Sequence, residues 1–185
     1  MTATATATLL ITKGSWSIDP ARSKVGFAVK HMGGIVHGEF TEFEGTFEVG
    51  DAPTAARAYG TVRATSVVTR DTRRDEHLRS PDFFDIDAHP DLRFASTRIE
   101  PLDDEELRIT GELTVNGITR EVVLRADMRG ADIDPFGDER VWLEVTGQIS
   151  RSDFGMNFNQ MLGAGNSMVA DKVRLVLHIS AVKHA

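Results

Sequence analysis

Apolar and polar side chains alternate along most of this chain, which is typical of β-strands with one buried face. The clearest case is residues 23–31, where Val25, Phe27 and Val29 alternate with polar or small residues. The same pattern predicts further strands over residues 15–18, 36–49, 58–68, 92–99, 107–115, 119–128, 141–149 and 172–182. Strands so numerous, with short connections, indicate a mainly all-β protein.

Two features refine the strand prediction. Asn116-Gly117 lies between two alternating runs and predicts a tight hairpin, because both central residues of such a turn need positive φ. In residues 36–49 the three phenylalanines occupy two different registers, which a β-bulge near Thr41 would reconcile. Gly38 and Gly45 in the same segment suggest bends in a curved sheet.

One stretch, residues 69–98, interrupts the strand pattern. Thr72 followed by Asp75 has the spacing of a helix N-cap with a first-turn acid, so we expect a helix from near Arg73. Pro81 ends that helix, and Ser80 can cap a second short helical turn. The sequence therefore predicts a short helical insert near residues 72–85.

About eight strands of this kind favour a closed antiparallel β-barrel, which leaves no exposed sheet edge. The interior of an eight-stranded barrel is just wide enough for side chains, or for one slender ligand as in lipocalins. The alternation alone favours a filled core. We expect one barrel domain over residues 15–185, preceded by a disordered tail over residues 1–14.

Composition narrows the function classes. The chain has 185 residues, a net charge of -7 and no cysteine, which excludes disulfides and thiolate metal sites. The negative charge argues against nucleic acid or an anionic membrane surface as the main partner. The N-terminal run Leu9, Leu10, Ile11 is too short for a signal sequence or a membrane span, so we expect a cytoplasmic protein.

Other candidate sites have ordinary explanations. The six histidines lack close metal-ligand spacing, although His31 and His37 could approach each other across the Gly33-Gly34 bend. Runs of acids such as Asp82, Asp85, Asp87 and Asp91 are typical of solvated faces. We therefore predict no metal, no cofactor and no catalytic residue.

Four blocks carry a family resemblance: residues 27–47, residues 69–97, GELTVNGITREVVL at residues 111–124, and RSDFGM at residues 151–156. In this order they resemble the YceI-like family of polyisoprenoid-binding proteins. The resemblance implies a lipocalin-like barrel with a helix near its mouth, which encloses a long isoprenoid chain such as that of a polyprenyl phosphate or a quinone. Its implied role is binding, storage or transport of that lipid.

Strand alternation, together with the apolar residues of the helical insert and the adaptable methionines, supplies the predicted lining of such a tunnel. These residues are Val25, Phe27, Val29, Phe40, Phe43, Phe47, Val62, Phe83, Phe84, Phe94, Leu113, Val115, Leu124, Leu143, Met156, Met161, Met168 and Leu175. The methionines fit an ordinary core equally well.

The candidate headgroup ligands are polar residues expected at the mouth: His31, Arg73, Arg74 and Arg79. The alternative is that the arginines pair with Asp71, Asp75 and Glu76 on the helix surface. Phe83 and Phe84 are expected to form a lid over the mouth, because so short a helix must be held by packing.

Two other functions stay open from sequence: an enzyme acting on a quinone-like or lipid substrate in the same cavity, and a filled barrel that serves as a protein-interaction module. No nucleophile, base and orienting group form a recognisable set, which disfavours the enzyme. The sequence also leaves open whether the chain is a monomer or a homodimer.

Overall fold

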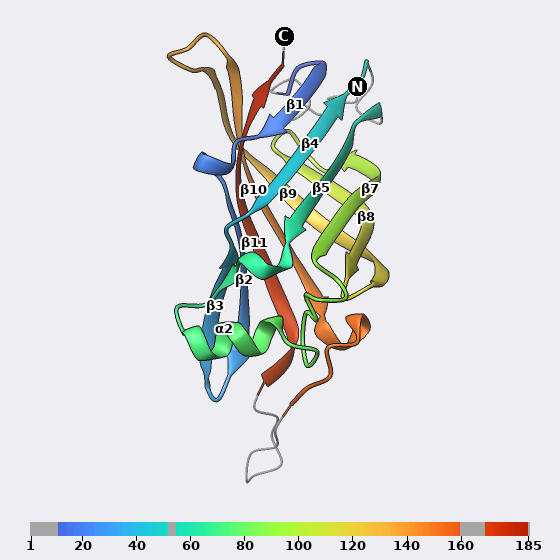
Figure 1. The fold of residues 1–185 in the computed structure, drawn as a ribbon. Helices are drawn as coiled ribbons and strands as arrows, with labels where there is room; N and C mark the ends of the chain where they lie inside the picture. Colours follow the sequence, from blue (N-terminus) through green and yellow to red (C-terminus); the bar gives the residue numbers. More distant parts are fainter. Residues whose placement is uncertain (1–10, 52–54, 160–168, 185) are drawn as a thin grey trace.

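A closed antiparallel β-barrel forms the body of the protein, as seen in a computed structural model that describes residues 11–51, 55–159 and 169–184 (Figure 1). The strands are β1 (Gly14–Ile18), β2 (Lys24–His31), β3 (Gly34–Phe40), β4 (Phe43–Val49), β5 (Arg57–Arg63), β6 (Val67–Val68), β7 (Asp91–Pro101), β8 (Glu106–Val115), β9 (Ile118–Ile133), β10 (Glu139–Ser150) and β11 (Val169–Lys183). The predicted eight-stranded barrel is confirmed.

The barrel closes because β1 pairs with both β4 and β11. The ring order is β1, β4, β5, β7, β8, β9, β10, β11. Strand β11 is long enough to pair with β1 near its C-terminal end and with β2 nearer its start. The hairpin of β2 and β3 therefore extends the wall at the lower end of the barrel in Figure 1, where helix α2 (Thr72–Arg79) also lies.

The expected long strand over residues 36–49 is two strands, β3 and β4, and the predicted bulge is a full break. Thr41 donates its backbone N–H to the carbonyl of Ser66 (3.3 Å), and the N–H of Glu42 donates to the Ser66 hydroxyl (3.1 Å). These bonds replace the strand ladder at the break. Because the chain restarts there, Phe40, Phe43 and Phe47 can all face the barrel interior despite their mixed spacing.

The expected strand over residues 58–68 is interrupted as well. Strand β5 ends at Arg63, one turn of 3₁₀ helix follows over Ala64–Ser66, and β6 then pairs with β3. This turn carries the chain from the wall of the barrel to the base of α2.

The Asn116-Gly117 hairpin is confirmed: the two residues have φ of 54° and 73° and connect β8 with β9. Gly38 and Gly45 lie inside strands and serve close packing. A Cβ atom on Gly38 would come within 2.2 Å of the Phe27 ring, so glycine here makes room for that ring.

The helix begins one residue earlier than predicted. Asp71 is the N-cap, and its carboxylate accepts a hydrogen bond from the Arg74 backbone N–H (3.1 Å). Asp75 is buried and accepts bonds from the N–H and hydroxyl of Thr69, which tie the helix to the preceding chain. Hydrogen-bonded turns, and no second helix, follow Ser80.

Of the predicted tail over residues 1–14, residues 1–10 lie outside the described residues, and residues 11–14 lie against the barrel. Ile11 is buried in the core cluster around Trp16, and the Trp16 indole donates to the carbonyl of Thr12 (3.0 Å). Apolar burial and this bond hold the segment against the barrel. Within the described residues, no helix is both long and apolar enough to cross a membrane.

Candidate functional site

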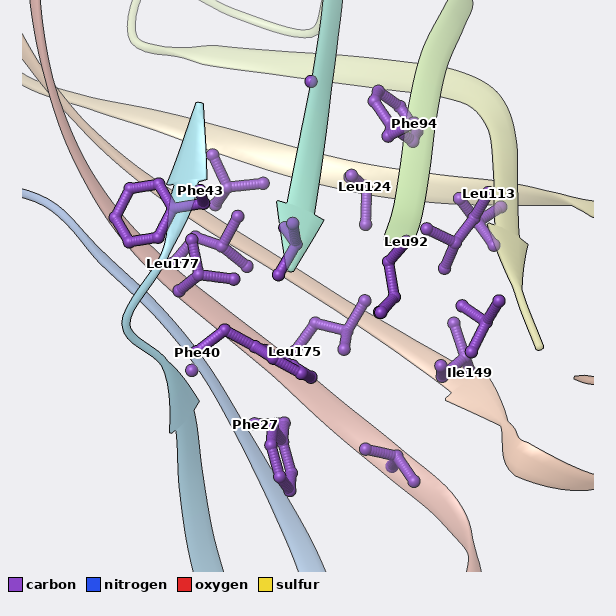
Figure 2. Close-up of a pocket in the computed structure, with 18 of the residues that line it drawn as sticks. Phe27, Phe40, Phe43, Leu92, Phe94, Leu113, Leu124, Ile149, Leu175 and Leu177 are labelled. Carbon is purple, nitrogen blue, oxygen red and sulfur yellow. The ribbon is translucent and has the colours of Figure 1, made fainter. Parts of the chain in front are cut away.

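The barrel is hollow. A cavity of about 750 Å³ lies inside it, within the size range of pockets that enclose drug-sized ligands. Figure 2 shows Phe27, Phe43, Phe94, Leu113 and Leu175, which come from five different strands, around this space. The filled core favoured by alternation alone is therefore wrong.

The two ends of the cavity differ in chemistry. Near β1 the lining is mainly hydrocarbon, with Ile11, Ile18, Val49 and Ala56 beside Thr46. At the other end the lining includes polar groups from α2 and the chain before it, together with His31 of β2: Thr69, Asp71, Arg73, Arg74 and His77. A long apolar ligand with one polar end would match this asymmetry.

The lining predicted from sequence agrees closely with this cavity. Every predicted lining residue lines it except Met161 and Met168, which lie outside the described residues. Binding of a ligand by these residues stays a prediction. Several lining residues were missed, including Leu92, Ile149 and Leu177, although each shares a strand face with a residue that was named: Phe94, Leu143 and Leu175.

Two phenylalanines that follow α2, Phe83 and Phe84, pack at the polar end of the cavity, which we call the mouth. Phe84 packs edge-on against Phe40 of β3, with ring centroids 5.6 Å apart. Phe83 contacts His77 of α2 and Phe158, at centroid distances of 5.1 and 5.6 Å. Both phenylalanines are buried and line the cavity, and their action as a lid stays a prediction.

The three candidate arginines of α2 differ. Arg73 is exposed, lines the cavity and makes no side-chain hydrogen bond or ion pair within the described part of the chain. Arg74 also lines the cavity, but its guanidinium is held by the hydroxyl (2.8 Å) and carbonyl (2.9 Å) of Thr69. Of the expected surface pairs, the described part of the chain shows Arg74 with Asp71, at 4.0 Å.

Arg79 does not line the cavity, contrary to its proposed place at the headgroup. Its guanidinium donates to the carbonyls of Thr65 (2.9 Å) and Val67 (3.0 Å). These two bonds hold the side chain beside the 3₁₀ turn.

Sequence reasoning missed a buried cation at the cavity wall. Arg151 donates hydrogen bonds to the carbonyls of Met156 (2.7 Å), Phe158 (2.8 Å), Ala170 (3.0 Å) and Val169 (3.3 Å). Burial lowers the pKa of Arg151, because desolvation disfavours the charged form. Its Cζ lies over the Phe83 ring, 6.0 Å from the ring centroid, as in a cation–π contact. Nothing in the strand pattern marked it as buried.

Comparison with known proteins gives a consistent result. The family model of the YceI-like domain matches residues 16–181. Protein YceI of Escherichia coli O6:H1 is 37% identical over 161 residues, which cover 86% of this chain and 81% of the relative.

Two solved structures are also similar. BcnA of Burkholderia cenocepacia has a TM-score of 0.76 at 24% identity and covers 88% of this chain and 98% of its own. A polyisoprenoid binding domain from Saccharophagus degradans has a TM-score of 0.68 at 13% identity and covers 91% and 98%. At such identities these two structures show a shared fold.

Proposed function

The chain belongs to the YceI-like family, and we propose that its barrel binds a long isoprenoid lipid, of the polyprenyl phosphate or quinone type, as a noncatalytic carrier or store. The observation that carries the proposal is the apolar cavity of about 750 Å³ along the barrel. The Saccharophagus degradans structure, which shares this fold, is described as a polyisoprenoid binding domain.

The hydrophobic effect supplies enough free energy for such binding. Each isoprene unit has five carbons, and at ~0.8 kcal/mol per buried carbon it contributes up to roughly 4 kcal/mol. Ordering costs and the ceiling on real affinities mean that a few buried units suffice. A longer tail would tune the fit instead of adding affinity in proportion.

Hydrocarbon lining also favours binding over catalysis. The side chains near β1, such as Ile18, Val49 and Ile179, offer no acid, base or nucleophile to a bound chain. Polar side chains of α2 and the chain before it line the mouth, where the polar end of a lipid would lie, and the wall of β4, β5 and β7 adds Glu44, Thr46, Tyr59, Thr61 and Arg93. A ligand held in this way is sequestered from water along its apolar length.

Native mass spectrometry of the protein purified from its own cells tests the proposal. We expect a bound mass that matches a prenyl lipid. Leu124→Trp, which fills the cavity with an apolar ring, should lose that mass, whereas Val123→Trp, on the exposed face next to it, should keep it. Wild-type protein that carries no lipid and takes up none from a prenyl lipid mixture would contradict the proposal.

The charge of the headgroup can be tested at the mouth. Arg73→Gln should weaken binding of a polyprenyl phosphate by roughly tenfold, because charge-assisted bonds are lost. Binding of the uncharged alcohol of equal chain length should not change. Arg79→Gln is the matched control, because Arg79 lies on the same helix but outside the cavity. Equal effects on both ligands would rule out a phosphate headgroup at Arg73.

A further inference from the structure

The tip of the β2–β3 hairpin presents apolar side chains to solvent beside the cavity mouth. Met32 is 57% exposed and Ile35 is 60% exposed. Their neighbours His31 and Val36 line the cavity, so the apolar tip borders the opening directly. Figure 1 shows this hairpin at the lower end of the barrel, where α2 also lies.

The backbone at this tip is unusual for its sequence. Met32 and Gly33 form the two-residue turn between the strands, with φ of 49° and 80°. A left-handed conformation favours glycine or asparagine and disfavours methionine. The β8–β9 hairpin has Asn116 at the equivalent place. Residues held in such conformations cluster at functional sites, so Met32 is a place to look for a role outside the fold.

Unpaired positive charges accompany the apolar tip. Lys30 lies directly opposite Ile35 in the strand pairing, and Arg73 lines the mouth. Arg70 follows β6, which pairs with Glu39 and Phe40 at the end of β3 away from the tip and runs in the direction of the tip. All three are exposed, and none of their side chains makes an ion pair in the part of the chain that the structure describes.

The opposite end of the barrel has a different character. The β9–β10 hairpin, at the top of Figure 1, also exposes apolar residues, with Phe136 at 80% and Ile133 at 65%. Its charged neighbours are acids, Asp132 and Asp138, which an anionic surface would repel. Between these two ends, within the described residues, the mouth end joins exposed apolar side chains to cations without an ion pair, and among its exposed acids are Asp71 and Glu76 of the α2 region.

We propose that the β2–β3 hairpin is a membrane-docking tip, which inserts Met32 and Ile35 into an anionic bilayer while Lys30, Arg70 and Arg73 contact its headgroups. This inference rests on the proposed function, since isoprenoid lipids reside in bilayers and must reach the mouth from there. The net charge of -7 on the whole chain opposes lasting adsorption. Docking is thus transient and directed, with the mouth facing the lipid.

Flotation with vesicles of phosphatidylcholine and phosphatidylglycerol tests the docking. The double variant Met32→Ser with Ile35→Ser should partition roughly tenfold less than wild type, because it loses its apolar anchors. Ile133→Ser with Phe136→Ser, at the acidic end, should partition like wild type. Wild type should also bind pure phosphatidylcholine vesicles more weakly. Equal partitioning of the two double variants would overturn the proposal.

A second measurement separates docking from ligand binding. The Met32, Ile35 double variant should bind a short-chain prenyl alcohol from solution as wild type does, but should extract a long-chain prenyl lipid from vesicles more slowly. If wild type binds the prenyl alcohol without associating with vesicles, docking fails and the proposed function stands. If it associates with vesicles but takes up no prenyl ligand, the proposed function fails instead.

Discussion

The volumes of single side chains determine how wide the interior of the barrel is. Phe27 lies opposite Gly38 in the β2–β3 pairing, and its ring occupies the space that a side chain at position 38 would need. Phe94 uses the absence of a side chain at Gly111 in the same way, 2.5 Å from the ideal Cβ position. Large rings thus lie against glycines, which keeps the middle of the barrel open.

Gly38→Ala should destabilise the protein by about 1–3 kcal/mol, since the added methyl group overlaps the Phe27 ring. Chemical denaturation measures the change. The double variant with Phe27→Leu should recover part of the loss. Gly130→Ala is the control, because the nearest atom to its ideal Cβ is 3.7 Å away, and it should change stability by less than about 0.5 kcal/mol. A neutral Gly38→Ala would show that the hairpin relaxes freely.

At this scale the sequence predicts apolar positions well and polar positions poorly. Phe27 and Leu124 were found because alternation alone places them on the inner face. Arg151 was not, because its burial depends on four carbonyls from residues 156–170 that only the folded chain brings together. For the same reason, Arg73 and Arg79 were both predicted at the headgroup, although Arg73 lines the cavity and Arg79 does not.

Among the elements, α2 and the turns after it are the ones whose sequence bears on access to the cavity. The helix was predicted, yet its cap was placed at Thr72, because Thr72 and Asp71 are both good cap residues and spacing alone does not choose between them. Asp75, which was expected to accompany a cap at Thr72, instead accepts a hydrogen bond from the Thr69 backbone N–H. These ties hold the base of α2 while the lid residues Phe83 and Phe84 contact the barrel by packing.

The lid predicts a kinetic effect. Phe83→Ala with Phe84→Ala should release a bound prenyl lipid at least about tenfold faster, because two buried rings that cover the mouth are lost. Stopped-flow transfer to acceptor vesicles measures the rate. Phe136→Ala, an exposed ring at the far end, should not change it. Unchanged release from the double variant would show that lipid leaves by another route.

The β9–β10 hairpin gives a prediction on pH. The Asp134 carboxylate accepts hydrogen bonds from the backbone of Asp138 and Phe136 and pairs with Arg140 at 3.2 Å, and these contacts lower its pKa. A lowered pKa stabilises the fold above the ordinary value of about 3.9, and this stabilisation is lost as pH falls through the lowered value.

Asp134→Asn should therefore lower the free energy of unfolding at pH 7, and the difference from wild type should shrink as pH falls below about 4. Urea denaturation at several pH values gives the comparison. A difference that stays constant down to the acid transition would show that the charge of Asp134 contributes nothing.

At the scale of the whole molecule, the strand pattern predicted that the barrel closes but did not predict that it is hollow. Alternation fixes which face of each strand points inward, whereas the space left inside depends on how the β2–β3 hairpin and the breaks at Thr41 and Arg63 shape the wall. The family resemblance, not the periodicity, supplied the expectation of a tunnel. The volume inside follows from the sum of many side chains across the barrel, which no local pattern contains.

A hollow barrel lacks the packing that stabilises an ordinary core, so a ligand that fills it should stabilise the fold. At a hundredfold excess over the dissociation constant, binding adds about 2.7 kcal/mol. For a chain of this length that corresponds to a rise in Tm of roughly 5–10 °C. Differential scanning calorimetry of delipidated protein with added prenyl lipid measures it, and Leu124→Trp should show little rise.

A chelator provides the complementary experiment. Within the described residues, no group of three His, Asp or Glu side chains could hold a metal ion, so no folding energy is expected to depend on one. EDTA should leave the Tm of both delipidated and lipid-filled protein unchanged. If EDTA lowered the Tm while added prenyl lipid did not raise it, the stabilising occupant of this protein would be a metal and not a lipid.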